Sequence, residues 1–476
     1  MKRTEQKAIL LILGIGQSLC YLFLFCVGNL RTQIIACEVG FFSAFLLYGV
    51  SLFLLRVLRS PAHKELDHYP SHCSFTNQRF CAITILCFSL LFRMIMWLSP
   101  PALSDDIYRY LWEGKLLVAG INPFTYAPSD PSLEHLHDLT IFLHINHKEY
   151  AAIYPPLNQF IFALSTLISP TITTMNLTFI LFDLFTMLML MFILRDLRMD
   201  LKRIIIYAWN PLIIMEFAGS GHLDSAGIFF LMLALYLCTK KRTYSPTIFL
   251  SLSFLNKFLP LIFLPFILTR KKVLNLVIFL LTVATLYIPF SGAGKKIFLS
   301  LLIYSQQWVF NASLYEVFLW MVSSPLKARG ISFVVLFLIV TGLFVWYKVK
   351  KGNEDEGLVY RVSFIALGSL LLLTPVLHPW YLCWMVPLLV IYPNRAWMFL
   401  TGSVFLSYWV LKGYVETGVW KESVMVKTVE YLPFYSLLLF DSARRYRTRL
   451  LLHTLNPVWQ IIHYFFHSFP TRKTNE

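Results

Sequence analysis

Apolar residues occupy long, uninterrupted runs along almost the whole chain, and short polar segments separate these runs. A continuous apolar run of about 18 residues or more is long enough to cross the hydrocarbon core of a bilayer as a helix. A transmembrane β-barrel would instead show short segments in which apolar and polar residues alternate. The pattern therefore predicts an all-α fold, a polytopic bundle of transmembrane helices.

Two apolar segments differ from a simple spanning helix. Residues 157–169 are too short to span comfortably, so we expect an interfacial or re-entrant helix there. Residues 245–268 are interrupted by Asn256, Lys257 and Pro260, which predicts a broken helical hairpin. About twelve further segments fit spanning helices: residues 8–30, 34–55, 81–99, 173–194, 204–218, 221–239, 273–290, 331–347, 358–376, 380–393, 396–411 and 430–441.

Composition agrees with a membrane protein. The chain is 57% hydrophobic and 14% charged, whereas soluble domains are about 45–50% apolar and about 25% charged. These values exclude a disordered chain and an ordinary cytosolic enzyme. The net charge of +16 would suggest a nucleic-acid partner in a soluble protein. Here we expect no nucleic acid, because the basic residues fit cytoplasmic connections that orient the helices in the bilayer.

The distribution of lysine and arginine also predicts an orientation. Most of them fall on one side when the N-terminus is placed in the cytoplasm, and the C-terminus then lies on the same side. The longest polar connection, residues 100–157, is thereby placed outside. The basic, amphipathic tail at residues 444–476 is expected to lie on the cytoplasmic membrane surface.

The outer connection opens with a polar segment, Ser-Asp-Asp-Ile-Tyr-Arg-Tyr-Leu-Trp-Glu-Gly, at residues 104–114. Asp105 and Asp106 follow a predicted spanning helix and therefore lie at the membrane surface. A carboxylate there could act as a general base on a hydroxyl group while a lipid-linked substrate remains in the bilayer. The pair could equally hold a divalent metal, share a proton, or begin a solvated helix.

Charged and aromatic residues continue this segment at helical spacing. Arg109 follows Asp106 by three residues and precedes Glu113 by four, so their side chains can share one helix face. An ion-paired surface helix is the simpler interpretation. Tyr110 and its aromatic neighbours suit a belt at the membrane interface, and they equally suit stacking against a sugar ring.

The segment before residue 225 combines glycine with polar side chains. His222 and Asp224 follow Gly219 and Gly221, which permit a tight turn or the close approach of a substrate. Asp224 could orient a sugar hydroxyl group or the imidazole of His222. A plain helix start with Asp224 in its first turn explains the pattern about as well.

Two later positions place polar groups inside the membrane or at its edge. Lys257 interrupts an apolar run, and an intramembrane charge indicates a function by default, although snorkelling or pairing with a carboxylate is the alternative. His378 stands at an outer helix boundary, where an interfacial histidine is the simpler interpretation. Trp380 and Tyr381 beside it fit an aromatic belt.

Several blocks of this chain occur in a characteristic order over about residues 80–395. They are the segment 104–114, Gly-Ile-Asn-Pro-Phe at 120–124, Tyr-Pro-Pro-Leu at 154–157, Trp-Asn-Pro-Leu at 209–212 with Glu216, Gly-His-Leu-Asp at 221–224, Lys257 with Pro260 and Pro265, and His-Pro-Trp-Tyr at 378–381. Together they resemble the GT-C superfamily of membrane glycosyltransferases. Within it, the chain is most similar to polyprenol-phosphate-mannose-dependent mannosyltransferases and their bacterial relatives.

The resemblance covers about residues 80–395, and the apolar and basic segments divide the rest of the chain. Residues 1–80 would hold two N-terminal helices and a cytoplasmic loop. Residues 81–395 would form a GT-C-like catalytic module with outer loops at 100–157 and 291–330. Residues 396–443 would add C-terminal transmembrane helices, and residues 444–476 are the tail.

The resemblance also implies an inverting mechanism with an aspartate base and no metal or other cofactor. Asp106 is the favoured base because it stands next to the Tyr-Arg-Tyr sequence, and Asp105 is its partner or alternative. A further set of residues would bind the phosphate or the sugar of the lipid-linked substrate. This set is Arg109, Tyr110, Glu113, Tyr154, His222, Asp224, Lys257, His378, Trp380 and Tyr381.

The sequence therefore predicts a glycosyltransferase that moves a hexose, most simply mannose, from a polyprenyl-phosphate-linked donor to a glycan or glycolipid acceptor. The expected location is a bacterial inner membrane with an outward-facing active site; an endoplasmic reticulum membrane with a luminal site is the alternative. Two other functions remain open, namely a transporter or flippase of a lipid-linked sugar, and a ligase-type transferase with another lipid-linked donor.

Overall fold

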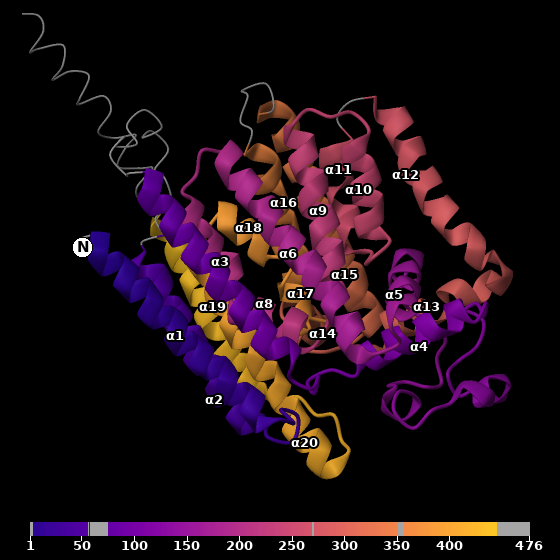
Figure 1. The fold of residues 1–476 in the computed structure, drawn as a ribbon. Helices are drawn as coiled ribbons and strands as arrows, with labels where there is room; N and C mark the ends of the chain where they lie inside the picture. The colour runs from indigo at the N-terminus through magenta and orange to yellow at the C-terminus, as the bar shows by residue number, and fades with distance from the viewer. Residues whose placement is uncertain (1–2, 56, 58–74, 269–270, 351–356, 445–476) are drawn as a thin grey trace, which may run out of the picture.

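The computed structural model describes residues 3–55, 57, 75–268, 271–350 and 357–444 (Figure 1). Every regular element in this part of the chain is a helix, and the only β pairing there is one isolated bridge between Phe310 and Val376. The expected all-α fold is confirmed. Apart from Arg444, the predicted amphipathic tail lies outside the described residues.

Six helical segments in the described part of the chain are long and apolar enough to cross a membrane. This finding supports a membrane protein, but it does not confirm about twelve continuous spans. The six lie in α1 (Arg3–Val27), α2 (Ile34–Leu54), α3 (Phe75–Trp97), α6 (Ile172–Asp196), α15 (Pro325–Lys350), and the succession α12 (Lys272–Tyr287), η6 (Ile288–Phe298) and α13 (Leu299–Gln307).

Other predicted spans are shorter helices or series of short pieces. Residues 201–219 divide where Pro211 follows Asn210, because proline cannot donate a backbone hydrogen bond and Asn210 caps the next turn. Neighbouring helices bury these pieces, which is the condition under which interrupted helices are tolerated inside a membrane. The pieces are η3 (Leu201–Ile204), α7 (Ile205–Ala208), α8 (Pro211–Ile213) and the π-helical turn η4 (Ile214–Gly219), followed by α9 (Asp224–Thr239).

The late segments are divided in the same way. Apart from α16, they consist of short pieces followed by a helix at residues 424–444 that is longer than the predicted 430–441. The elements are α16 (Leu358–Leu373), α17 (Pro379–Leu382), α18 (Val386–Ile391), α19 (Arg395–Ser403), η8 (Val404–Trp409) and α20 (Val410–Thr417).

The predicted broken hairpin is confirmed. Helix α10 (Ser245–Phe254) ends just before Asn256, and η5 (Leu259–Phe263) and α11 (Leu264–Ile267) follow. The side chain of Asn256 donates to Asn158 Oδ1 at 2.7 Å, and Asn158 Nδ2 donates to the Asn256 carbonyl at 2.7 Å. Asn158 lies on α5 (Pro156–Ile168), the expected short helix, so the two unusual segments hold each other.

The two connections that the sequence predicts to lie outside, named here the first and second outer connections after that prediction, contain helices of their own. The first holds α4 (Asp106–Val118), η1 (Pro131–Leu136) and η2 (Phe142–His144). The second, predicted for residues 291–330, overlaps the end of the apolar segment that begins with α12, because it includes most of η6 and all of α13. It also holds α14 (Leu314–Val322), and it ends earlier than predicted because α15 already begins at Pro325.

The helices form one packed bundle. In Figure 1, α1, α2 and α3 lie along one edge, α6, α9 and α10 fill the centre, and α12 stands at the opposite edge. Helix α4 packs on α5 and α6 in the lower half of the same view. Inside the bundle, Arg93 of α3 pairs with Asp183 of α6 at 2.5 Å, and Tyr207 also donates to Asp183. This charged pair joins two spanning helices without contact with lipid.

Helices α4 and α5 approach each other closely at Gly114 of α4. A Cβ atom at this position would lie 2.7 Å from the Phe162 carbonyl oxygen of α5. We therefore expect Gly114→Ala to destabilise the fold by about 1–3 kcal/mol, since backbone cannot yield to an added methyl group. Thermal unfolding of purified protein in detergent measures this loss. Gly49→Ala on α2, where nothing lies within 4 Å, is the matched control, and an equal melting temperature for both variants would contradict the prediction.

Candidate active site

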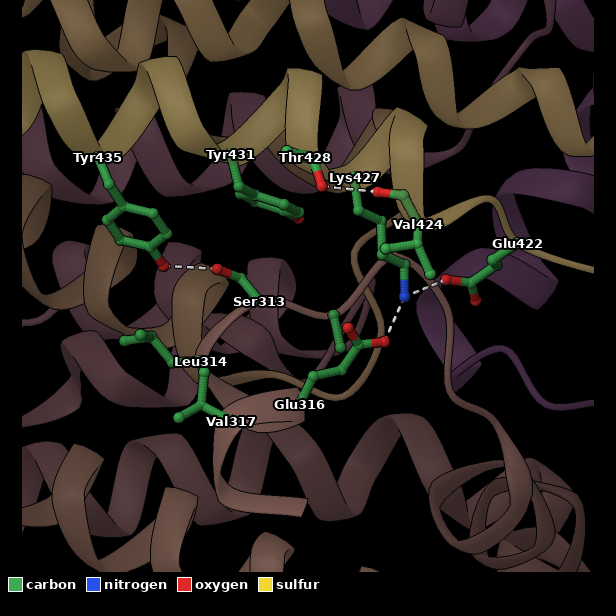
Figure 2. A pocket seen from close by; sticks show the side chains of 11 residues that line it. Ser313, Leu314, Glu316, Val317, Glu422, Val424, Lys427, Thr428, Tyr431 and Tyr435 are labelled. Atoms are coloured by element: carbon green, nitrogen blue, oxygen red, sulfur yellow. Dashed lines mark hydrogen bonds and ion pairs between the residues drawn. The ribbon is translucent and has the colours of Figure 1, made fainter. Parts of the chain in front are cut away.

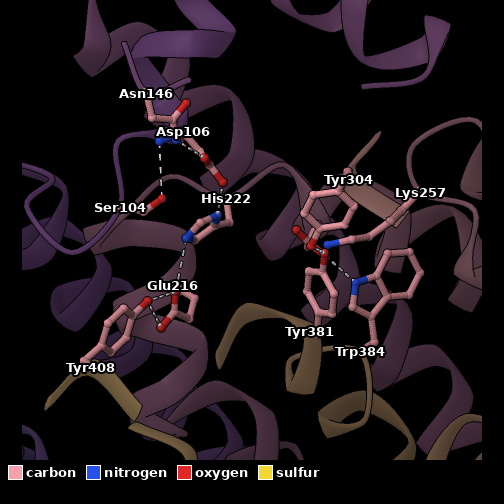
Figure 3. Close-up of polar contacts among 11 residues, drawn as sticks. Ser104, Asp106, Asn146, Glu216, His222, Lys257, Tyr304, Tyr381, Trp384 and Tyr408 are labelled. Carbon is pink, nitrogen blue, oxygen red and sulfur yellow. Dashed lines mark hydrogen bonds and ion pairs between the residues drawn. The ribbon is translucent and has the colours of Figure 1, made fainter. Parts of the chain in front are cut away.

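Asp106 is the first residue of α4, and its carboxylate faces a turn from another part of the chain. The side chain of Asn146 donates to Oδ1 at 3.0 Å, and Ser104 Oγ accepts from the Asp106 backbone at 3.3 Å. Oδ2 lies 3.9 Å from Nδ1 of His222, as Figure 3 shows. The side chain of Asp106 is 20% exposed, so the carboxylate is anchored through Oδ1 and the side chain as a whole remains partly accessible.

The neighbouring Asp105 has a different environment. Arg31, between α1 and α2, binds its two carboxylate oxygens at 2.7 and 3.0 Å. Arg31 also donates to the Ala102 carbonyl at 2.7 Å, which fixes the guanidinium group in place. The negative charge of Asp105 is therefore neutralised by a bidentate pair, whereas Asp106 has only neutral hydrogen-bond partners.

This difference affects the basicity of Asp106. Burial raises the pKa of the Asp106 carboxyl group, and the negative charge of Asp105 raises it further, while the hydrogen bond from Asn146 lowers it. The net direction is upward. A carboxylate that is more basic than ordinary aspartate and still accessible is suited to accept a proton.

His222 lies in the turn before α9, between two carboxyl groups. Gly221 has φ +70°, and a Cβ atom there would lie 2.6 Å from Ile107, so the turn requires glycine. The imidazole Nε2 lies 3.3 Å from Glu216 Oε2, opposite to the side that faces Asp106. The ring is buried and stacks on Trp380 with centroids 4.1 Å apart.

Aromatic rings extend from His222 toward the second outer connection. Trp380 also stacks on His378 at 4.2 Å, and His378 stacks on Phe310 at 4.6 Å. The backbone of Phe310 pairs with the segment before His378 through the bridge to Val376. Flat apolar faces beside hydroxyl and carboxylate groups are suited to hold a sugar ring.

A second charged group lies beside this stack. Lys257, in the break after α10, contacts Asp224 Oδ1 at 2.7 Å, and the Trp384 indole donates to the same oxygen at 2.6 Å. The Lys257 amino group also lies 3.5 Å from the centre of the Tyr381 ring (Figure 3). The hydroxyl of Tyr381 contacts that of Tyr304 at 2.9 Å. The charges of Lys257 and Asp224 both act on Asp106.

The remaining predicted residues stabilise the outer connection from within. Arg109 is buried, pairs with Glu113 at 2.9 Å, and donates to the carbonyls of His147 and Tyr150. Glu113 in turn accepts from Gln159. The guanidinium group of Arg109 therefore forms its hydrogen bonds within the protein, where it holds the first outer connection in place.

Tyr110 and Tyr154 pack against each other in the same region. Their ring centroids lie 5.0 Å apart in an edge-to-face arrangement, and Tyr110 also stacks on Phe162 of α5 at 4.7 Å. Both rings thus belong to a small apolar core beneath the first outer connection.

Sequence reasoning missed several partners of the site. Arg31, Asn146, Tyr304 and Tyr408, whose hydroxyl donates to Glu216 at 3.0 Å, carry no local motif, and only the fold brings them to their partners. Trp384 offered a weak signal, because it lies one helical turn after Trp380. Within the described residues, no group of three or more His, Cys, Asp or Glu side chains gathers in a way that could hold a metal ion.

A separate cavity of about 360 Å³ lies at the second outer connection (Figure 2). Its polar end is the amino group of Lys427, which pairs with Glu316 and Glu422. Tyr431 and Tyr435 line its wall. Lys427 thus joins the segment before the last described helix to α14, next to the loop that contacts His378.

A comparison with protein families identifies the chemistry. The model of the alpha-(1->6)-mannopyranosyltransferase family, N-terminal domain, matches residues 36–271, just under half of the chain. The chain is a mannosyltransferase. The matched region includes Asp105, Asp106, His222, Asp224 and Lys257. Comparisons with curated proteins and with solved structures give no significant match.

The pair between Lys257 and Asp224 allows a stability test of the enzyme. Lys257→Met leaves the fully buried carboxylate of Asp224 without its cation, so we expect a loss of about 3 kcal/mol. The double variant Lys257→Met/Asp224→Asn removes both charges and should recover part of this loss. Thermal unfolding in detergent gives the coupling. Lys327→Met, at an exposed position, is the control, and additive losses in the double variant would refute the coupling.

Proposed function

We propose that the enzyme transfers mannose from a polyprenyl-phosphate-linked donor to a glycan or glycolipid acceptor on the extracytoplasmic face of the membrane. The observation that carries this proposal is the unequal pair of carboxylates at residues 105 and 106. Arg31 neutralises Asp105, whereas Asp106 is accessible and more basic than ordinary aspartate. A single displacement at a sugar carbon needs a base for the attacking hydroxyl, a cation for the leaving group and a surface that holds the sugar. An accessible carboxylate beside a lysine and stacked aromatic rings meets these needs.

In this mechanism, Asp106 is the base. The acceptor hydroxyl oxygen attacks the anomeric carbon as its proton passes to Asp106 Oδ2. The bond between that carbon and the phosphate oxygen breaks, and the electron pair leaves with the lipid phosphate. The attack comes from the face opposite to the leaving group, so the configuration at the anomeric carbon inverts.

The leaving phosphate gains negative charge, and a fixed cation near it lowers the barrier. Lys257 is suited to this role, because its side chain is partly exposed and Asp224 holds its amino group against the Tyr381 ring. Since lysine supplies the positive charge, the mechanism invokes no metal or other cofactor. In the stack of His222, Trp380 and His378, the partly exposed rings of Trp380 and His378 offer flat faces for the sugar.

The membrane location follows from the same arrangement. Asp106 begins α4 a short distance after the spanning helix α3, so its carboxylate can reach the head group of a lipid that remains in the bilayer. The excess of basic residues on the opposite side of the membrane favours an extracytoplasmic site. A bacterial inner membrane fits this orientation, and a luminal site in the endoplasmic reticulum is the alternative.

Separate substitution of the two aspartates tests the proposal. We expect Asp106→Asn to lower kcat for transfer from polyprenyl-phosphate mannose by at least about 100-fold, because the amide cannot accept the proton. Asp105→Asn should keep activity within about 10-fold of the wild type. Radiolabelled lipid donor and purified enzyme in vesicles give the rates, with a nucleotide-linked mannose run in parallel.

The matched carboxamide substitutions control for folding, since both variants should melt close to the wild type. Retention of transfer by a folded Asp106→Asn enzyme would refute the proposed base. Transfer from the nucleotide sugar alone would refute the proposed donor.

The pH dependence of transfer provides an independent check. A base works in its ionised form, so activity falls as the pH drops through the pKa of Asp106. Because this pKa is raised, the acidic limb of the kcat/KM profile should lie above the ordinary aspartate value of 3.8. Asp105→Asn removes a nearby negative charge and should move the limb to lower pH. If the acidic limb of the kcat/KM profile has the same position in Asp105→Asn as in the wild type, a group other than Asp106 determines it.

A further inference from the structure

Glu216 occupies a position that the proposed mechanism does not use. It lies in the π-helical turn η4, is completely buried, and approaches His222 from the side opposite to Asp106. Asp106, His222 and Glu216 thus form a row, with separations of 3.9 Å from Oδ2 to Nδ1 and 3.3 Å from Nε2 to Oε2 (Figure 3). The following inference rests on the proposed role of Asp106 as the base.

The surroundings of Glu216 favour a neutral carboxyl group. Its hydrogen-bond partner is Tyr408, whose hydroxyl lies 3.0 and 3.1 Å from the two carboxyl oxygens. No lysine or arginine forms an ion pair with Glu216 in the part of the chain that the structure describes. A fully buried carboxyl group without a cation is more stable when protonated.

The protonation of Glu216 decides which nitrogen of His222 carries hydrogen. A protonated carboxyl group can donate to Nε2, and a neutral imidazole then carries its hydrogen on Nδ1, which faces Asp106. An ionised Glu216 would instead accept from Nε2–H and leave the lone pair of Nδ1 facing the Asp106 carboxylate. That second arrangement is repulsive while the base is charged.

We propose that Glu216 is a positioning residue that donates a hydrogen bond to His222 Nε2, so that His222 presents Nδ1–H to the Asp106 carboxylate. Stacking on Trp380 holds the plane of the imidazole ring in this row. The distance of 3.9 Å shortens to a hydrogen bond when substrate closes the site, as catalytic contacts commonly do. The proton taken from the acceptor then stays on Asp106.

Two substitutions at Glu216 test this role. Glu216→Gln keeps both contacts, because the amide group donates to Nε2 and its carbonyl oxygen accepts from Tyr408. We expect kcat within about threefold of the wild type. Glu216→Leu removes the donor, and we expect kcat to fall at least about tenfold while KM for the lipid-linked sugar stays within twofold.

The pH profile is the readout that a merely structural role would not move. A hydrogen bond from Nδ1–H to the charged form of Asp106 lowers the pKa of that carboxyl group. Its loss in Glu216→Leu should move the acidic limb of kcat/KM to higher pH, whereas the limb of Glu216→Gln should not move. The ionisable groups around His222 and Glu216 that are the same in both variants are Asp106, Asp224, Lys257, His378, Tyr408, Cys37 and Cys383.

Each outcome decides between the proposals. An inactive but folded Glu216→Gln enzyme would show that an ionised carboxylate is required and would overturn the positioning role. A Glu216→Leu enzyme with normal kcat and an unmoved limb would overturn it as well. If Glu216→Leu fails to fold, Glu216→Gln still tests the role, because a folded Glu216→Gln enzyme that is inactive or whose acidic limb has moved overturns it. Failure of the aspartate base itself appears separately, as transfer activity in Asp106→Asn.

Discussion

The pair between Lys257 and Asp224 is the contact on which the arrangement of the site depends. A lysine and a carboxylate buried to this extent are tolerated only because each neutralises the other and neighbouring groups complete their hydrogen bonds. Asp224 begins α9, Lys257 lies in the break after α10, and Trp384, which donates to the same carboxylate, comes from the late segments. Three distant parts of the chain are thereby joined at one oxygen atom. The side chain of Lys257 can therefore remain partly exposed while the buried carboxylate of Asp224 balances its charge.

A second charge pair produces the asymmetry that the chemistry needs. Two adjacent carboxylates would repel each other and raise both pKa values if neither had a cation. Arg31 removes this symmetry, because it binds Asp105 with both of its terminal nitrogens. The N-terminal helices therefore do more than anchor the chain, since the turn between α1 and α2 determines which aspartate stays free. Nothing in the local sequence around Arg31 indicates this role.

The sequence predicted the elements whose signal is local and left out those that depend on long-range packing. The break at Asn256 and the short helix α5 were evident from proline and polar residues within apolar runs. The division of residues 201–219 into four pieces was not, because apolar composition alone cannot distinguish a continuous span from buried short helices. The same holds for the site. Asp106, His222 and Lys257 stood out by type, whereas Asn146, Tyr408 and Trp384 are defined only by the side chains they meet.

The late segments complete a site whose charged groups lie in the matched region. Asp106, His222, Asp224 and Lys257 all precede residue 271, the end of the family match. Trp380, which stacks on His222, and Trp384, which donates to Asp224, both follow it. Tyr408, whose hydroxyl donates to Glu216, follows it as well. Charged groups buried without such neutral partners would be poorly oriented and costly. The neutral side chains that follow residue 271 therefore orient the charged side chains that precede it. Substitutions on either side of residue 271 should affect the same step, the transfer of the sugar.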